Sequence, residues 1–456
     1  MRRFGQRQSM GAYLGPLWGL IVALVMISTP ARAAESTEIM DVFSRDAEAA
    51  IDTSISLSWE MEHREGRILR EFSCLAHDNI PGGGNELCPE GSRFLLGKEM
   101  VAERQTHLLF IDASIAYRRY FQASLRIPVV LHDLTTLEMD SAGGVSSANS
   151  SVDPDNFPSL FSLPFTGSTR SGVKDPTLTF RVAPLSFARD KTQATWVIDV
   201  ALTSGLVPVR QAGNAAVGEG TWRLDVGTAV SVRPEWWVEP WFRMDTFMRF
   251  QDAGSLFQNL ADTQTLTSPG HAIAASLGTT FIPLEDVEGR STLTIDVGGM
   301  IHYRFEGREY TELFEALGTS ECDPSNPQPC DLTTYDLGAN SFLDGTERRK
   351  TDGVTDVEQY ATASTWVNMR YQILEWVSVR AGFSFAYELP HFITFADAGE
   401  DKNGDQVVQL EDPSDPVGQP NEYSPVYATA LDGIGNRFRT GGMMTYSVMF
   451  GLEGKF

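Results

Sequence analysis

Apolar and polar residues alternate with a period of two in twelve runs along the chain. In the first run, for example, Ile55 and Leu57 alternate with Ser54 and Ser56. Successive side chains of a β-strand point to opposite faces, so each run predicts a strand with one apolar and one polar face. The runs cover approximately residues 51–62, 104–118, 120–133, 173–187, 192–207, 220–233, 236–250, 271–284, 290–306, 357–374, 376–389 and 440–456.

The connections between these runs alternate between long and short. Counted from the first run, the odd connections hold about 12 to 50 residues and the even ones about 1 to 5. A β-sandwich also has alternating strands, but nothing in its connectivity requires this rule. Barrels of bacterial outer membranes do have tight periplasmic turns and long outer loops. We therefore predict an all-β fold, a transmembrane up-and-down antiparallel β-barrel of about 12 strands that forms one domain over residues 51–456.

The first 33 residues have the layout of a secretory signal peptide. Arg2 and Arg3 supply a positive start, residues 17–27 are apolar, and Ala31-Arg32-Ala33 gives a small-x-small cleavage pattern. The apolar run is shorter than the roughly 20 residues of a spanning helix, which disfavours an uncleaved anchor. We expect residues 1–33 to be removed and residues 34–50 to form a short periplasmic segment. Export of a barrel places it in the outer membrane of a Gram-negative bacterium.

The chain ends in an alternating run that closes on an aromatic residue. Tyr446, Val448, Phe450, Leu452 and Phe456 share one face. This run resembles the closing strand of outer-membrane β-barrel proteins, whose last residue is typically Phe. The resemblance implies that the barrel assembly machinery reads this strand as a partner. More loosely, the chain resembles outer-membrane transporters grouped with proteins of the MetA phenol-degradation pathway, although no diagnostic motif carries that narrower resemblance.

The charge of the chain excludes one class of partner. Lys and Arg number 36 and Asp and Glu number 60, which gives a formal net charge of −24. Such a chain repels phosphate, so we expect no nucleic-acid partner. Many of the acidic residues fall in predicted loops such as 397–415, which favours a solvated surface over an acidic partner-binding face.

Four cysteines form two close pairs in sequence, Cys74 with Cys88 and Cys322 with Cys330. Each pair lies within one Gly/Pro-rich segment of an exported chain, which favours two local loop disulfides. Zinc is the alternative, but the short Cys-x-x-Cys spacing and nearby histidines are missing.

Closure of the barrel would turn the apolar strand faces toward lipid and the charged faces inward. Aromatic residues near the run ends, among them Trp59, Trp236 and Trp376, fit the interfacial girdles of such barrels. We predict the following pore-lining residues from the polar strand faces: Asp112, Arg126, Arg181, Asp199, Arg223, Asp225, Arg243, Asp245, Asp296, Trp366, Arg370 and Arg380.

Two interpretations of this charged lining compete. In the first, opposite charges on neighbouring strands neutralise each other and let charged residues occupy a narrow interior. In the second, Arg126, Arg181, Arg243, Arg370 and Arg380 form a basic strip that attracts anionic solutes. We favour the neutral lining because the two signs interleave. The inward rings of Trp366 and Tyr360 either offer a stacking surface for a sugar or an aromatic solute, or fill space.

The last predicted outer loop contains a fragment of a calcium-binding pattern, Asp401-x-Asn403-x-Asp405. Oxygen ligands at this spacing can converge on a hard cation. The pattern departs from an EF-hand loop because Gln406 replaces the expected glycine and Asp412 occupies position twelve. We therefore expect no cofactor, with loop calcium as the alternative to a solvated acidic loop.

These features predict a passive outer-membrane channel or transporter for small solutes, with membrane lipid around it. One alternative is a plugged structural or surface-recognition barrel, since the loops at 134–172, 307–356 and 390–439 are long enough to fill the mouth, and residues 157–165 are unusually apolar. Another is an outer-membrane lipid hydrolase with a Ser–His pair on the lipid face. His107 lacks a serine on that face of an adjacent strand, so we expect no enzyme.

Overall fold

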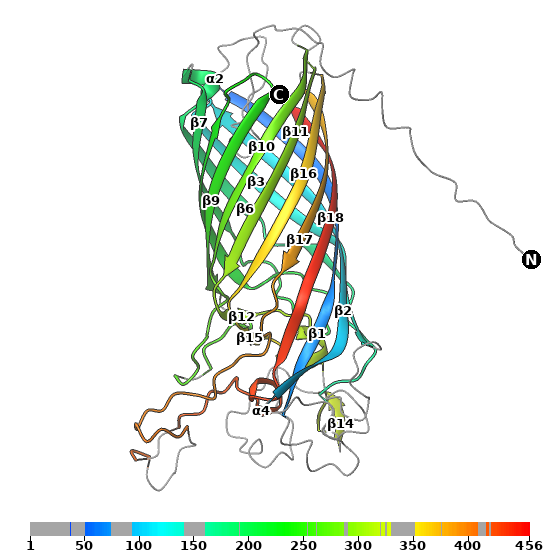
Figure 1. The fold of residues 1–456 in the computed structure, drawn as a ribbon, viewed down its shortest axis with the longest axis vertical. Helices are drawn as coiled ribbons and strands as arrows, with labels where there is room; N and C mark the ends of the chain where they lie inside the picture. The colour runs from blue at the N-terminus through cyan, green and yellow to red at the C-terminus, as the bar shows by residue number, and fades with distance from the viewer. Residues whose placement is uncertain are drawn as a thin grey trace, which may run out of the picture.

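The structure is a computed structural model that describes residues 37, 51–73, 94–140, 160–190, 192–252, 254–260, 262–286, 291–319, 321–323, 326–329, 352–374, 376–408, 416–418 and 421–456. Twelve strands form a closed barrel (Figure 1). They are β1 (Ile51–Ser73), β2 (Phe94–Tyr117), β3 (Phe121–Met139), β6 (Thr177–Leu185), β7 (Ala194–Thr203), β8 (Thr221–Val232), β9 (Val238–Gln251), β10 (Ala272–Asp286), β11 (Ser291–Arg304), β16 (Tyr360–Leu374), β17 (Val377–Glu388) and β18 (Phe438–Lys455).

Each barrel strand pairs antiparallel with its neighbours in the chain, and β1 pairs with β18 to close the ring. Closure extends to the last residue, because the amides of Thr53 and Phe456 donate to each other's carbonyl oxygens at 3.0 and 2.8 Å. The prediction of an up-and-down antiparallel barrel is therefore confirmed. Among the described residues, no helix is long and apolar enough to span a membrane.

The remaining elements are short. Strands β4 (Phe165–Thr166) and β5 (Arg170–Val173) pair with β3. Two small sheets join β12 (Gly307–Glu309) to β15 (Thr355–Val357) and β13 (Glu321–Asp323) to β14 (Asn326–Pro329). The helices are α2 (Phe187–Asp190), α3 (Phe314–Gly318) and α4 (Thr429–Asp432).

The barrel has two unlike ends. Short connections such as the turn at Arg118 and Arg119, both with positive φ (48° and 56°), lie at the end that holds the C-terminus (Figure 1). Long connections lie at the opposite end. We call these the turn end and the loop end.

Strands β1 and β2 are longer at the loop end than the sequence pattern predicts, with 23 and 24 residues. Together with β18, they reach farther toward the loop end than β9, β16 and β17 do (Figure 1). Beyond Glu62 the chain reads His63-Arg64-Glu65-Gly66-Arg67, which has no apolar face. This part of the wall extends past the region where an apolar exterior is needed, so the alternation that reveals the other strands disappears here.

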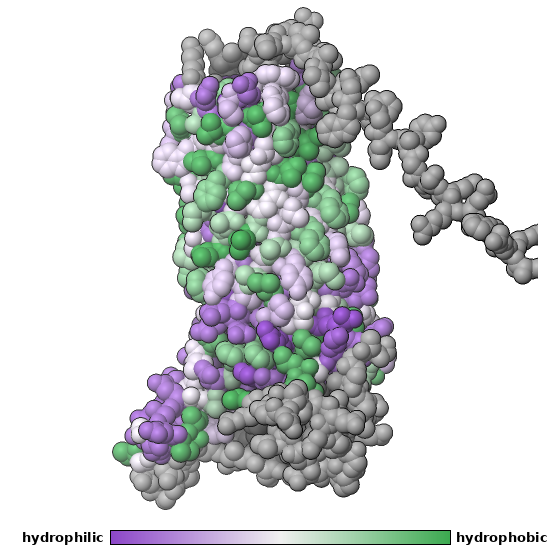
Figure 2. Space-filling model, viewed as in Figure 1, coloured by the Kyte–Doolittle hydropathy of each residue, from purple (hydrophilic) through white to green (hydrophobic). Residues whose placement is uncertain are grey.

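The outside of the barrel wall carries large apolar side chains in the exposed positions. Ile55, Leu277 and Phe450 are 58%, 67% and 55% exposed. Figure 2 shows apolar and weakly polar residues over the middle of the wall and hydrophilic residues where the wall approaches the loop end. A soluble protein rarely exposes apolar area of this extent.

A small apolar cluster of Ala116, Ala183, Val197 and Ala229 lies near the turn end, and the largest one among the described residues lies inside the loop end. Inward-facing residues of β1, β2, β3 and β18 pack there against residues of the long connections. The cluster comprises Ile68, Met100, Ala102, Leu137, Phe438 and Met443 from the strands and Phe161, Leu313, Ala316, Leu317, Ile393, Ala428 and Leu431 from the connections. We call residues 160–170, 307–319, 390–397 and 421–437 together the cap.

Candidate functional site

A cavity of about 450 Å³ lies inside the barrel and is lined mainly by charged and hydroxyl side chains. The lining comes from many strands, because every second residue of a barrel strand points inward. Its charged members are Asp112, Arg126, Arg181, Asp199, Arg223, Asp225, Arg243, Asp245, Arg370, Arg380, Glu453 and Lys455.

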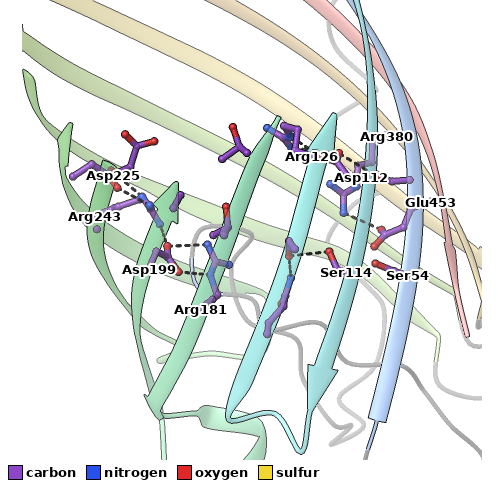
Figure 3. Close-up of a pocket in the computed structure, with 18 of the residues that line it drawn as sticks. Ser54, Asp112, Ser114, Arg126, Arg181, Asp199, Asp225, Arg243, Arg380 and Glu453 are labelled. Carbon is purple, nitrogen blue, oxygen red and sulfur yellow. Dashed lines mark hydrogen bonds and ion pairs between the residues drawn. The ribbon is translucent and has the colours of Figure 1, made fainter. Parts of the chain in front are cut away.

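One chain of ion pairs follows the wall from β6 to β9 (Figure 3). Asp199 accepts from Arg181 Nε at 2.6 Å and from Arg243 Nη1 at 2.6 Å. Arg243 in turn contacts Asp245 at 2.6 Å. A single buried carboxylate therefore bridges two guanidinium groups, and the low-polarity wall strengthens both contacts.

A second bridge joins the last three strands of the barrel. Glu453 on β18 accepts from Arg370 Nη2 at 2.7 Å and from Arg380 Nη2 at 2.9 Å. Ser378 donates to the same carboxylate oxygen at 3.0 Å. Like Asp199, Glu453 holds two arginines of different strands.

Two further pairs complete the charged lining. Arg126 contacts Asp112 at 2.6 Å, and Arg223 contacts Asp225 at 3.0 Å. The Arg126 side chain is 57% exposed, so this pair remains open to the cavity. All six cavity arginines thus contact a carboxylate, which fits the hypothesis of a mutually neutralised lining better than that of a separate basic strip.

The positive and negative charges of the cavity lining do not cancel completely. The cavity lining holds seven cationic side chains (six Arg and Lys455) against five carboxylates (Asp112, Asp199, Asp225, Asp245 and Glu453), an excess of two positive charges. The whole chain, by contrast, carries −24. The lining of this cavity therefore has the opposite sign of net charge from the protein as a whole.

Ten of the twelve predicted pore-lining residues line this cavity, and Asp296 and Trp366 do not. Trp366 and Trp241 stack with ring centroids 5.9 Å apart, and each donates its indole N–H to Asp296 at 2.9 Å. Thr280 donates to Asp296 at 2.7 Å. This network satisfies the buried carboxylate and holds the two indoles against the wall.

Tyr360, the other ring expected to face inward, also has a protein partner. Its ring stacks on His391 with centroids 3.9 Å apart and an interplanar angle of 7°. Neither Tyr360 nor Trp366 lines the cavity.

Sequence reasoning missed Glu453 and Lys455, and with them the bridge to Arg370 and Arg380. The signal was present, because Leu452 and Phe456 were assigned to the outward face, which puts residues 453 and 455 on the inward face. The sequence placed Ser54 and Ser56 on the polar face of the first strand but did not single them out as pore-lining, and it gave no sign of other hydroxyl residues such as Thr179. Small polar residues occur on both faces of many strands and carry no charge pattern.

The cap crosses the barrel at the loop end. Glu309 contacts Arg304 of β11 at 3.0 Å and Arg249 of β9 at 3.4 Å. Three residues later, Glu312 contacts Arg64 of β1 at 2.8 Å. In the strand order β9 lies opposite β1. The segment from Glu309 to Glu312 therefore runs from one wall of the barrel to the other.

A buried ion pair fastens α3 beneath this crossing. The Arg170 guanidinium, 1% exposed, contacts Glu315, and its other nitrogens donate to Asn214 Oδ1 at 3.0 Å and to the Ala216 carbonyl at 2.8 Å. The amide of Ser168 donates to Glu315 at 2.5 Å. One arginine thus joins the connections after β3, β7 and β11.

The predicted calcium-binding loop folds into a compact turn. Carboxylate oxygens of Asp401, Asp405 and Glu422 lie within 4.8 Å of one another. Asn403 donates to Asp405 at 3.2 Å, and the amides of residues 402 and 403 donate to Glu422. Backbone amides already occupy several of these oxygens, and calcium binding stays a prediction.

Several predicted features lie outside the described residues. These are the signal peptide, most of the segment 34–50, Cys74, Cys88 and Cys330, while Cys322 lies in β13 without a described side chain. Both disulfides therefore stay predictions. His107 lies on the outer face, and the hydrogen-bond partner of its ring among the described residues is Gln105 at 3.3 Å.

No protein-family model and no curated protein matches the chain. Among solved structures, an outer-membrane channel of Pseudomonas putida F1 aligns over 92% of this chain and 100% of its own, with 10% identity and a TM-score of 0.38. The outer-membrane protease OmpT of Escherichia coli aligns over 92% of this chain and 100% of its own, with 10% identity and a TM-score of 0.30. A FadL homologue of Pseudomonas aeruginosa aligns over 90% of this chain and 90% of its own, with 8% identity and a TM-score of 0.31. Similarities of this size support no functional conclusion.

Proposed function

We propose that this protein is a passive diffusion channel for small polar solutes in the outer membrane of a Gram-negative bacterium, with a weak preference for anions. The observation that carries the proposal is the charged cavity inside a closed barrel. Lipid supplies no hydrogen bonds to a sheet edge, so a closed barrel with an apolar exterior suits a bilayer. Barrels of this class have their short turns in the periplasm, so we propose that the turn end faces the periplasm and the loop end faces the outside of the cell.

The chemistry of the wall sets the class of solute. A lining of guanidinium, carboxylate and hydroxyl groups replaces part of the hydration shell of a small polar solute and offers little to an apolar one. The excess of two positive charges favours anions, while the ion pairs limit that preference. No energy-coupling site is proposed, so transport follows the concentration gradient.

Single-channel recording in planar bilayers tests this proposal. Under a KCl gradient we expect discrete currents whose reversal potential is shifted toward the equilibrium potential of chloride. Arg126→Glu should move that potential toward the equilibrium potential of potassium, because the Arg126 side chain is the most exposed of the six cavity arginines. Arg439→Glu is the matched control, since Arg439 lies on the outer face of β18 between the buried Phe438 and Thr440. An unchanged reversal potential in the Arg126→Glu channel contradicts a charged permeation path.

The cap favours a second candidate, a closed barrel with a structural or surface-recognition role. The segment across the mouth and its apolar core are the supporting observations. Glu315→Ala removes the carboxylate that fastens α3 to Arg170 and should loosen the cap. Currents that appear or increase in this variant support a gated channel. Silence in both the wild type and the variant contradicts the channel proposal and leaves the structural one.

We propose no enzymatic role. The support is limited to the partner of His107, which is an amide and not a serine hydroxyl. Phospholipid hydrolysis by the purified, folded protein is the measurement that contradicts this expectation.

A further inference from the structure

One arginine inside the loop end differs from the others in its surroundings. Arg210 lies on the connection between β7 and β8, in a small hairpin closed by the Val209–Gly218 bridge. Within the described residues its guanidinium forms no ion pair and donates no hydrogen bond, and its Nε is buried without a partner. The residue as a whole is half-buried, so its terminal nitrogens still reach solvent-accessible space.

Aromatic side chains of the cap hold this guanidinium in place. Its carbon lies 5.0 Å from the ring centroid of Tyr310 and 5.4 Å from that of Phe314. The two rings pack edge to face at 4.7 Å, and the Tyr310 hydroxyl donates to the Glu219 carbonyl at 3.2 Å. Stacking of this kind fixes the plane of a guanidinium and leaves its edge free to donate.

The neighbouring charges make the position electropositive. Arg104 and Arg170 lie near Arg210, but each is already engaged, Arg104 with Asp133 at 2.7 and 2.8 Å and Arg170 with Glu315. Burial, together with these two cations, lowers the pKa of Arg210 to about 10. At neutral pH the group is still charged, and Asp133, the carboxylate that acts on it, is already bound by Arg104.

We propose that Arg210 is a binding site for a small carboxylate or another small anion beneath the cap, on the loop side of the charged cavity. Leaving a buried charge without a partner is costly, and an incoming anion would remove that cost. The planar edge of a guanidinium matches the two oxygens of a carboxylate. Anion binding at Arg210 does not depend on the proposed function. Only the role of the site rests on that function, because in a channel Arg210 is the first contact of an anionic solute after the cap.

Binding can be measured without any current. The line width of the ³⁵Cl NMR signal, recorded with the full chain folded in a non-ionic detergent, reports bound chloride, and sodium acetate should displace it. We expect Arg210→Gln to weaken the acetate-sensitive binding by about tenfold or more, the value of a charge-assisted hydrogen-bonded pair. Arg210→Lys keeps the charge without the planar fork and should retain part of the binding.

The matched control is Arg439→Gln. Arg439 also stacks on an aromatic ring, with its guanidinium carbon 5.5 Å from the centroid of Phe392, and its Nε is also buried without a partner, but it lies on the outer face. Wild-type binding by Arg210→Gln, or an equal loss in Arg439→Gln, overturns the site. Anion binding by a barrel that never conducts contradicts the proposed function and leaves the site, so the two failures are distinguishable.

Discussion

Two carboxylates inside this barrel act as bridges between arginines of different strands. Asp199 joins Arg181 of β6 to Arg243 of β9, and Glu453 joins Arg370 of β16 to Arg380 of β17. A bridging carboxylate reduces the repulsion between two cations and also satisfies several buried donors. Loss of the carboxylate therefore affects both arginines at once.

Glu453→Gln tests this dependence. The variant leaves Arg370, whose side chain is 8% exposed, and Arg380 without the carboxylate that joins them. We expect a loss of about 3–5 kcal/mol in the free energy of unfolding, the usual effect of removing one partner of a buried pair. Urea titration of the folded protein in lipid vesicles measures it.

Asp112→Asn is the comparison for Glu453→Gln. It breaks a pair whose arginine is 57% exposed, and we expect a loss of no more than about 1 kcal/mol. Equal losses for the two substitutions contradict the view that burial decides the contribution of these pairs.

The sequence predicted which residues of the strands face inward but not which of them meet. The alternation of side chains along a strand identifies its inward face, and ten of the twelve residues predicted in this way line the cavity. The contacts of Asp296 with Trp241 and Trp366 depend on the register between strands. Register follows from pairing across the sheet and has no signature in one strand alone.

The cap is the element whose structure the sequence left open. Its central ion pair joins Arg170 to Glu315, which are 145 residues apart in the chain. No periodicity reveals a contact of that kind. Residues 157–165 are unusually apolar, and the burial of Phe161 in the cap core shows that the described part of this segment folds inward.

Arg308 of the cap and Asp356 of β15 form a buried pair with 3.5 Å between Oδ1 and Nε. Asp356 is 2% exposed, and neither of its carboxylate oxygens accepts a hydrogen bond from a described residue. Burial, together with the nearby carboxylates Asp352 and Asp397, raises the pKa of Asp356 to about 6 despite the opposing effect of Arg308.

The cap should therefore be more stable at lower pH. The folded protein binds the Asp356 proton more tightly than the unfolded chain, whose ordinary pKa is 3.8. Stability then falls as the pH rises from about 4 to about 6, by at most about 3 kcal/mol in total. Hydrogen exchange of residues 307–319, corrected for intrinsic rates, measures this between pH 5 and pH 7. In Asp356→Asn the pH dependence should disappear; its persistence in that variant assigns it to another group.

At the scale of the whole molecule, the barrel combines an apolar exterior with a charged interior. The alternation of apolar and polar residues and the rule in the connection lengths were enough to predict this arrangement. The extended ends of β1 and β2 were not predictable in the same way, because they lie beyond the apolar band. Contact with lipid requires every second residue to be apolar, and the strand ends outside the lipid have no such requirement.

The depth of the apolar band can be tested with one charge at two heights. Phe383, 51% exposed, lies near the middle of β17, and Leu389, 48% exposed, follows its loop end. Phe383→Arg should reduce the free energy of folding into vesicles by about 2–4 kcal/mol, and Leu389→Arg by about 0–1 kcal/mol. Urea-dependent folding measures both. Similar costs at the two positions contradict a bilayer centred on β17.

The position of Glu453 on the closing strand has a consequence for biogenesis. Arg370 and Arg380 belong to β16 and β17, which precede β18 in the chain, and their shared carboxylate arrives only with β18. Before β18 is in place, the sheet lacks the carboxylate that joins these two arginines. Pairing of β18 with β17 brings Glu453 to both, so addition of the last strand is favoured by electrostatic attraction as well as by backbone hydrogen bonds.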